Sequence, residues 1–243
     1  MITMCMNLLV VNPNSTLSMT DKLTQILPIT RADVKYHYFT NPTGPPSIDD
    51  EATALLSAEN CMKALVQTNM DQYDGFVVAC YSLHPLVGML KRQTKKPVVG
   101  VFEASITACL QLLEASQKFG IVSTGKIWET LLTTGVSLIL GASDGGTRFA
   151  GVQTTGFSAI ELHEAPLKDV QRRMKEATKR LIQTNHNDVA AICLGCVAMA
   201  DMRTVVREAC IEEFGETVGS QIRIVDGFTA ATGIVQGLIG LSV

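Results

Sequence analysis

Two short apolar runs in this chain each lead into a cysteine, and this repeated pattern constrains the fold more than any other feature. Gly75–Ala79 is wholly apolar and runs directly into Cys80, while Val189–Leu194 runs through Gly195 into Cys196. Runs of this length and composition are typical of parallel strands that are buried on both faces. Ligands of open α/β sheets bind outside the carboxyl ends of the strands. Both cysteines are therefore predicted at a ligand-binding edge of a sheet.

Strand-like and helix-like patterns alternate along the whole chain, which indicates an α/β fold with mainly parallel sheets. The other predicted strands cover residues 7–11, 33–39, 97–102, 119–123, 149–154 and 222–225. The predicted helices cover residues 15–27, 48–69, 85–93, 104–115, 126–138, 166–184, 201–214 and 228–241. The helix that follows Cys80 is expected to begin near Pro85, with Ser82 as its candidate N-cap.

The two halves of the chain are alike. A polar turn begins at Asn12 in the first half and at Ser123 in the second, and a strand-end cysteine follows each turn at a similar distance. We therefore predict two similar α/β domains, each a mainly parallel sheet flanked by helices, related by pseudo-twofold symmetry with the site between them. The predicted first domain covers residues 1–97, with residues 215–243 packing back on it, and the second covers residues 98–214.

Composition narrows the classes of partner. The 243 residues carry a net charge of −3 and lack clusters of Lys or Arg interleaved with aromatic residues, which argues against binding nucleic acid. No apolar run approaches the roughly 20 residues of a membrane-spanning helix. The seven cysteines form no regular framework, so we expect free thiols in the reducing cytoplasm. We expect a small-molecule substrate, no nucleic-acid or membrane partner, and a homo-oligomer.

Two motifs suggest cofactors or metals, and neither is complete. Gly120 to Lys126 fits the spacing of a phosphate-binding loop, but Ile127 stands where such a loop needs Ser or Thr. Cys193 and Cys196 have the spacing of a redox or zinc pair, yet no second pair accompanies them. We expect no metal and no cofactor. Cys193 is interpreted as a small core residue, as are the cysteines at 5, 61, 109 and 210.

Cys80 and Cys196 are better explained by acid–base chemistry. A thiol at the start of a helix is more readily ionised, because the helix dipole and the free N–H groups favour the thiolate. One thiolate and one thiol on opposite sides of a cleft supply a base and an acid to opposite faces of a bound carbon. This arrangement inverts a stereocentre without a cofactor. His84 is either a base that activates Cys80 or a residue that lines the cleft, and the second role is favoured.

Several motifs together resemble the aspartate/glutamate/hydantoin racemase superfamily, and the chain is most similar to its hydantoin and allantoin racemase branch, including fungal members. They are Asn-Pro-Asn-Ser-Thr (12–16), Ala-Cys-Tyr-Ser-Leu-His-Pro-Leu (79–86), Phe-Gly-Ile-Val-Ser-Thr-Gly-Lys-Ile-Trp (119–128), Leu-Gly-Cys (194–196) and Val-Asp-Gly-Phe-Thr-Ala (225–230). The resemblance implies two similar α/β domains with Cys80 and Cys196 as the paired catalytic bases. It also implies substrate-binding roles for Asn14, Ser15, Ser82, Ser123, Thr124, Gly195 and Val197.

Two departures from the family pattern bear on the substrate. Bacterial relatives commonly have Phe-Gly-Asp-Pro-Gly after the first cysteine, where this chain has Tyr-Ser-Leu-His-Pro (81–85). Many relatives have Ala-Gly-Met after the second cysteine, where this chain has the bulkier Val-Ala-Met (197–199). The expected activity is cofactor-independent racemisation of a cyclic ureide of the hydantoin or allantoin type.

Other functions stay open at this point. An amino-acid racemase, a maleate-isomerase-like enzyme or a decarboxylase would keep the fold, although a decarboxylase needs only one of the two cysteines. A non-catalytic ligand-binding or regulatory protein is the alternative from a different class. No Arg or Lys adjoins either cysteine in the sequence, which favours a neutral ureide over an amino-acid carboxylate.

Overall fold

The computed structural model describes residues 5–26, 33–186 and 188–241. The chain forms two compact units. The first unit comprises Met1–Ala104 together with Phe228–Val243, and the second comprises Ser105–Gly227. No helix in the described ranges is long and apolar enough to cross a membrane.

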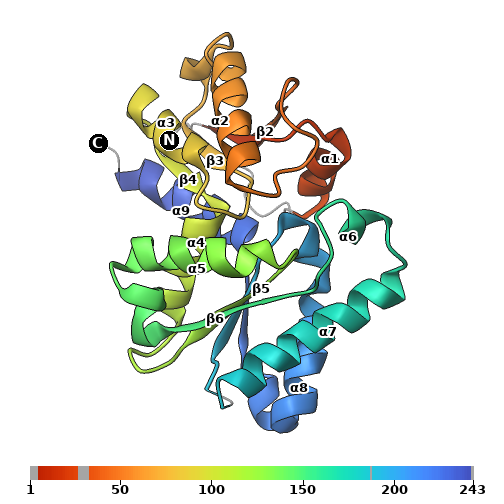
Figure 1. The fold of residues 1–243 in the computed structure, drawn as a ribbon. Helices are drawn as coiled ribbons and strands as arrows, with labels where there is room; N and C mark the ends of the chain where they lie inside the picture. Colours follow the sequence, from red (N-terminus) through yellow and green to blue (C-terminus); the bar gives the residue numbers. More distant parts are fainter. Residues whose placement is uncertain (1–4, 27–32, 187, 242–243) are drawn as a thin grey trace. The chain divides into compact units, whose positions relative to one another are not determined.

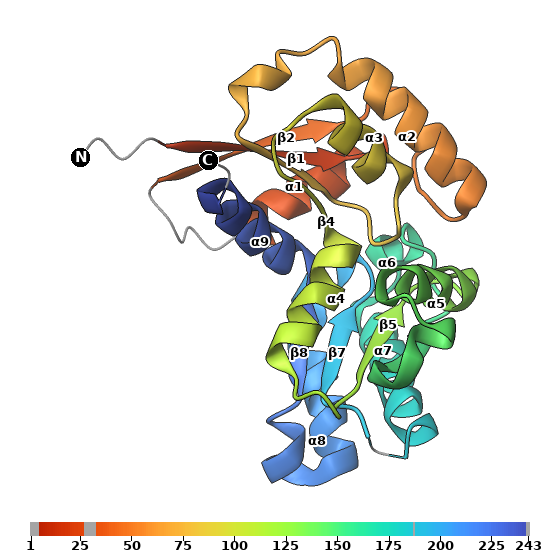
Figure 2. The same cartoon turned by 90° about the vertical axis from the view of Figure 1, so that its left-hand side faces the viewer.

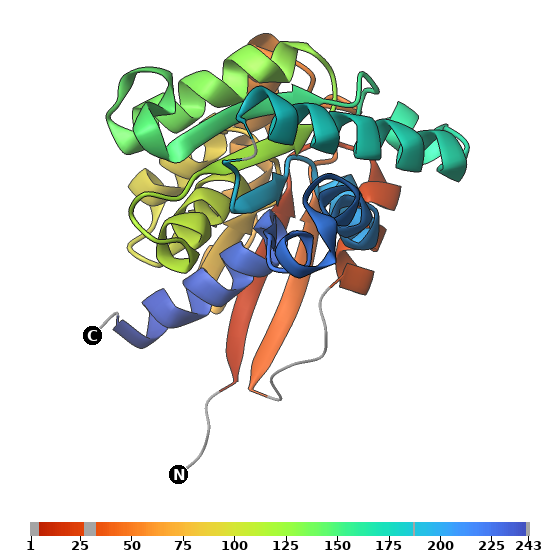
Figure 3. The ribbon, with the colours of Figure 1, turned by 90° about the horizontal axis from the view of Figure 1, so that it is seen from below.

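The first unit is built on a four-stranded parallel sheet with the order β2-β1-β3-β4. Its strands are β1 (Met6–Asn12), β2 (Val34–Thr40), β3 (Gly75–Val78) and β4 (Val98–Gly100). Figure 3 shows β1 and β2 running side by side. Its helices are α1 (Leu17–Ile26), α2 (Glu51–Leu65), the short 3-10 turn η1 (Met70–Gln72), α3 (Pro85–Gln93) and most of α9 (Gly227–Leu241). Helix α2 packs against α3 (Figure 2).

The second unit repeats this plan, with a parallel sheet in the order β6-β5-β7-β8. Its strands are β5 (Phe119–Ser123), β6 (Phe149–Thr154), β7 (Ala191–Leu194) and β8 (Arg223–Asp226). Its helical segments are most of α4 (Val101–Leu112), α5 (Ile127–Leu140), η2 (Ser143–Arg148), α6 (Glu161–Glu164), α7 (Leu167–Thr184), η3 (Val197–Met202) and α8 (Arg203–Gly219). Helix α7 packs on β5 and β6 and against α8 (Figure 1).

The two sheets share one topology. In each unit the strands lie in the order second, first, third, fourth along the chain, and all described pairs are parallel. The predicted α/β fold with two similar, mainly parallel sheets is therefore confirmed. Short runs such as Gly75–Val78 and Ala191–Leu194 are fully buried, because helices cover these central strands.

The boundaries of the units differ from the predicted ones. The first boundary lies at 104/105 rather than 97/98, and the second at 227/228 rather than 214/215. Residues 215–227 belong to the second unit because β8 pairs with β7, with Ile224 opposite Ile192. The chain from residue 228 onward belongs to the first unit, where Gln236 Nε2 donates a hydrogen bond to the Tyr36 hydroxyl at 2.9 Å.

The core of the second unit shows how the sequence pattern becomes packing. Helix α7 buries Val170, Met174, Ala177 and Leu181, which are spaced so that they form one stripe along the helix. This stripe packs with Val122, Ile192, Leu194 and other apolar residues in one cluster. The opposite face of α7 carries charged side chains, which explains why the sequence reads as an amphipathic helix.

This core predicts a large difference between two leucines of α7. Leu181 is fully buried, whereas Leu167 is 59% exposed. Leu181→Ala should lower the free energy of unfolding by about 2–5 kcal/mol, because it removes buried methyl groups and leaves a cavity. Leu167→Ala is the matched control and should change it by no more than about 0.5 kcal/mol. Urea denaturation of both variants tests this; equal losses would contradict the assigned packing.

Candidate active site

Cys80 lies just beyond the carboxyl end of the central strand β3. The backbone N–H of Ala79 donates to the Val11 carbonyl at 2.9 Å, which holds the chain against β1 as it leaves the sheet. A tight turn follows, in which Ser82 N–H donates to the Cys80 carbonyl at 3.0 Å and His84 N–H donates to the Ser82 carbonyl at 2.8 Å. The Cys80 thiol is partly exposed and lies 3.4 Å from the Ser82 hydroxyl. The turn thus places a hydroxyl group beside the Cys80 sulfur.

Helix α3 begins at Pro85 as predicted, but its N-cap is His84 and not Ser82. The His84 Nδ1 accepts a hydrogen bond from Leu86 N–H at 3.2 Å. Proline at the first helical position puts the N-cap at the residue directly before it. The Ser82 hydroxyl is left facing Cys80, which suits its predicted role beside the substrate.

The surroundings of His84 support neither of its two predicted roles, because a side chain that is 2% exposed does not line an open cleft and its nitrogens are both engaged. The imidazole is 2% exposed, and this burial lowers its pKa to about 4, so the ring is neutral at pH 7. Because Nδ1 accepts from Leu86, the proton lies on Nε2, which faces the Ser57 hydroxyl at 3.4 Å. Neither ring nitrogen then offers a free lone pair, so the geometry does not support the alternative in which His84 activates Cys80 as a base.

The turn after β1 brings Asn14 and Ser15 to the same edge of the sheet. Asn12, at the strand end, is buried and donates from Nδ2 to the Asn14 Oδ1 at 2.9 Å. The same Asn14 oxygen accepts from Thr16 N–H at 2.9 Å, and Ser15 N–H donates to the Pro45 carbonyl at 2.9 Å. Because β1 and β3 are adjacent and parallel, this turn and the Cys80 turn both follow the carboxyl ends of neighbouring strands.

Cys196 holds the corresponding position in the second unit, beyond the end of β7. Gly195 N–H donates to the Val122 carbonyl at 2.7 Å, and the buried Ser123 hydroxyl donates to the Gly195 carbonyl at 2.8 Å. A Cβ atom on residue 195 would lie 2.7 Å from both the Val122 oxygen and the Ser123 Cβ. Position 195 therefore requires glycine, because β5 and the turn after β7 approach too closely for a side chain.

The two remaining predicted site residues of this unit each adjoin a residue already described: Thr124 follows Ser123, and Val197 follows Cys196. Thr124 is 3% exposed and its carbonyl accepts from Gly156 N–H at 3.0 Å. Val197 is partly buried and opens η3 directly after Cys196. Ser123 and Thr124 therefore shape the end of β5, where the Ser123 hydroxyl and the carbonyl groups of both residues take part in hydrogen bonds within the protein. Their predicted contact with a substrate stays a prediction.

Exposure separates the seven cysteines, all of which lie in the described ranges. Cys80 and Cys196 are partly exposed, and each stands two residues beyond the third strand of its sheet. The cysteines at positions 61, 109, 193 and 210 are fully buried, in agreement with their predicted core role. Cys5 is exposed, so its prediction as a core residue was wrong; it precedes β1, beyond the covered part of the sheet.

The buried thiols are poorly suited to proton transfer. Burial raises the pKa of Cys61 to about 12 and that of Cys210 to about 11. The pKa of Cys109 is also raised, by its hydrogen bond with Cys193 at 3.3 Å and by burial. Cys193 thus pairs with Cys109 in the core and not with Cys196 across the motif. Within the described ranges, no cluster of three or more His, Cys, Asp or Glu residues has the geometry to hold a metal ion.

Sequence reasoning missed the residues that hold these turns in place. Ser57 and Asn41 are fully buried and both donate to the Pro13 carbonyl, at 2.7 and 2.9 Å. Neither residue belongs to a motif, and Ser57 looks like an ordinary position within α2. Both were missed because their role depends on contacts with segments that are distant in the sequence.

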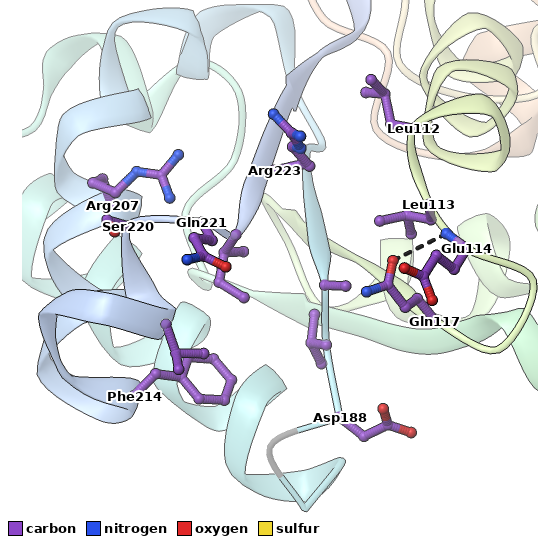
Figure 4. A pocket seen from close by; sticks show the side chains of 14 residues that line it. Leu112, Leu113, Glu114, Gln117, Asp188, Arg207, Phe214, Ser220, Gln221 and Arg223 are labelled. Atoms are coloured by element: carbon purple, nitrogen blue, oxygen red, sulfur yellow. Dashed lines mark hydrogen bonds between the residues drawn. The ribbon is translucent and has the colours of Figure 1, made fainter.

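A cavity of about 730 Å³ in the second unit lies at the opposite edge of the sheet (Figure 4). Its lining includes Asp188 before β7, Gln221 before β8, and Glu114 and Gln117 before β5. These are the amino ends of the strands, whereas Cys196 follows a carboxyl end. The cavity is therefore separate from the cysteine edge of this unit.

Thiol labelling tests the contrast among the cysteines. In a Cys5→Ser background, iodoacetamide near neutral pH should modify Cys80 and Cys196 at least tenfold faster than the four buried cysteines, because thiolate character and access control the rate. Mass spectrometry of tryptic peptides over time measures each rate. Equal labelling of all six remaining cysteines would remove the basis for treating Cys80 and Cys196 as reactive.

The buried His84 predicts a specific pH dependence of stability. Its folded pKa of about 4 lies below the unfolded value of 6.5, so the unfolded state binds more protons between these limits and stability falls as the pH falls. Urea denaturation at pH 7 and pH 4 should show that the parent loses about 2–3 kcal/mol more than His84→Asn, which lacks the titrating group. Equal losses in the two proteins would show that His84 is not buried in its neutral form.

Comparison with known proteins agrees with this architecture. The family model described as Asp/Glu/Hydantoin racemase matches residues 8–235. An uncharacterized protein of Schizosaccharomyces pombe is 35% identical over 97% of this chain and 92% of its own length. The hydantoin racemase of a Pseudomonas species is 24% identical over 97% of this chain and 87% of its own. The crystal structure of the allantoin racemase from Pseudomonas fluorescens superposes with a TM-score of 0.82 and 24% identity, covering 98% of this chain and 92% of that one.

The family match spans both units and includes the turns that carry Cys80 and Cys196. The chain belongs to the Asp/Glu/hydantoin racemase family.

Proposed function

We propose that this protein is a cofactor-independent racemase of a five-membered cyclic ureide, of the hydantoin or allantoin type, in which Cys80 and Cys196 are the two bases. Membership of the family makes the protein a racemase, and so an isomerase. The observation that carries the proposal is the matched pair of partly exposed thiols, each two residues beyond the third strand of its sheet. The substrate class is supported by the activities named for the hydantoin and allantoin racemases among its relatives.

The proposed reaction moves one proton onto the protein and one off it. The thiolate of one cysteine removes the proton from the ring carbon beside the carbonyl, and the electron pair of the C–H bond moves into that carbonyl as an enolate. Backbone N–H groups at the strand ends stabilise the developing oxyanion. The other cysteine, as a thiol, gives its proton to the opposite face of the carbon. The two sulfurs then exchange protons with water, which restores the starting state.

The turn around Cys80 supports the thiolate that this mechanism needs. A free cysteine with a pKa of about 8.5 is only a few per cent ionised at pH 7. A hydroxyl that donates to the sulfur favours the charged form. The Ser82 hydroxyl lies 3.4 Å from the Cys80 sulfur and is placed to donate in this way. The mechanism also requires both thiols to stay reduced, so we infer that the protein works in a reducing compartment, as in the cytoplasm.

The two-base proposal predicts different behaviour for each cysteine. Cys80→Ser and Cys196→Ser should each lower racemisation of allantoin or a substituted hydantoin by at least 10³-fold, because a serine hydroxyl near pH 7 is a far poorer base than a thiolate. Each variant keeps one thiol, so in heavy water it should still exchange the ring-carbon proton of one enantiomer. The two variants should select opposite enantiomers, as measured by proton NMR and polarimetry.

Cys5→Ser is the matched control and should racemise at the parent rate. If either active-site serine variant racemises at the parent rate, the paired-base mechanism fails. If the parent leaves ureides unchanged but racemises aspartate or glutamate, the protein is an amino-acid racemase. If it racemises none of these compounds, the proposed substrate class is wrong.

A further inference from the structure

One buried chain of hydrogen bonds connects the two turns at the cysteine edge of the first unit. His84, which ends the Cys80 turn, faces the Ser57 hydroxyl of α2 through Nε2 at 3.4 Å. The same hydroxyl lies 2.7 Å from the Pro13 carbonyl, in the turn after β1. His84 is 2% exposed and Ser57 is fully buried, so water does not replace these contacts. The turn after β1, helix α2 and the Cys80 turn are thus connected by hydrogen bonds, although they are distant in the sequence.

The direction of each hydrogen bond follows from the donors and acceptors present. A carbonyl accepts only, so the Ser57 hydroxyl donates its single proton to Pro13. Its oxygen is then free to accept, which suits the Nε2–H of the neutral His84 ring. Nδ1 of the same ring accepts from Leu86 N–H. His84 is therefore held at both nitrogens, once by its own helix and once by α2.

We propose that His84 is a positioning residue for Cys80: through Ser57 it joins the Cys80 turn to the turn after β1 and so holds the thiol in its reactive orientation. That His84 contributes to catalysis in this way rests on the proposed function of Cys80 as a base. The link to the sulfur is short, because His84 N–H donates to the Ser82 carbonyl and the Ser82 hydroxyl lies beside Cys80. A loosened His84 would release the turn that aims the Ser82 hydroxyl at the sulfur.

The second unit provides an internal comparison. The residue that follows Cys196 by the same spacing as His84 follows Cys80 is Ala200, which has no polar side chain. The turn at Cys196 is held instead by the Ser123 hydroxyl on the Gly195 carbonyl. Variants of His84 and Ser57 should therefore change Cys80 and leave Cys196 unaffected, within the same molecule.

Three substitutions separate the positioning role from a merely structural one. His84→Asn keeps an acceptor for Leu86 N–H, and asparagine is a favoured N-cap, but its shorter side chain does not reach Ser57. His84→Gln keeps a donor that reaches Ser57 but lacks a well-placed cap acceptor. Ser57→Ala removes the hydroxyl, while the Pro13 carbonyl keeps its hydrogen bond from Asn41 Nδ2 at 2.9 Å. His84→Asn should therefore be more stable to unfolding than His84→Gln. His84→Gln should retain more of the reactivity of Cys80 than His84→Asn.

The first readout is the iodoacetamide labelling rate of each cysteine in the folded protein, which does not require turnover. His84→Asn and Ser57→Ala should each slow the labelling of Cys80 by about 3–10-fold, equivalent to a pKa rise of about 0.5–1, and leave Cys196 within twofold. His84→Gln should stay within about twofold of the parent. The double variant should match the single variants, because both remove the same connection. His37→Asn, which alters a histidine that contacts Asn7 instead, is the matched control and should label like the parent.

The second readout is the steady-state kinetics with each enantiomer of the ureide. Because the two enantiomers are equally stable, kcat/KM must be equal in the two directions, so kcat and KM are compared separately. His84→Asn and Ser57→Ala should lower kcat about tenfold, with KM changed by less than about threefold, because the substrate contacts are kept and the thiol is misplaced.

These two readouts distinguish failure of the inference from failure of the proposed function. Slowed labelling of Cys80 alone, with rescue by His84→Gln, supports the positioning role even if the tested ureides are not substrates. Equal effects on Cys80 and Cys196, additive effects in the double variant, or loss in His84→Gln as large as in His84→Asn would overturn it. Unchanged kcat in an active enzyme with slowed Cys80 labelling would overturn the catalytic part of the inference.

Discussion

The pairing of the first and third strands in each sheet is the constraint on which the site depends. In the first unit Ala79 N–H reaches the Val11 carbonyl, and in the second Gly195 N–H reaches the Val122 carbonyl. These hydrogen bonds extend the parallel pairing by one residue beyond the strand, and the chain then leaves the sheet. The next residue is in each case the partly exposed cysteine. A slip of one residue in this register would turn the cysteine from the open edge toward the core.

The two units use the same topology but hold their cysteines differently. Behind Cys196, a strand-end serine bonds directly to the backbone of the turn, and glycine is required because the two segments are so close. Behind Cys80, the support comes from a helix residue, Ser57, and from a buried histidine. The repeated fold therefore presents a cysteine at the same place in each unit, while the contacts that hold the two cysteines differ.

Burial determines which of the chemically identical thiols are accessible for chemistry. A thiolate is strongly disfavoured in an apolar core, so Cys61 and Cys210 stay protonated and act as small apolar side chains. Cys193 shows that the sequence spacing of two cysteines does not by itself indicate that they act together. It precedes Cys196 by three positions, but it points into the core because it lies inside β7, where it meets Cys109. The end of the strand thus separates the buried Cys193 from the partly exposed Cys196.

Much of this protein follows from local sequence, and the remainder depends on contacts between distant segments. Apolar runs, proline and helical spacing are local signals, so the alternating strands and helices, the repeated halves and the start of α3 at Pro85 could be predicted. The resemblance of short motifs pointed to Cys80 and Cys196. The unit boundaries could not be predicted, because β8 is assigned by its pairing with β7. The partner of His84 was equally hidden, since Ser57 meets His84 and the Pro13 carbonyl only when α2 packs on the sheet and excludes water from these hydrogen bonds.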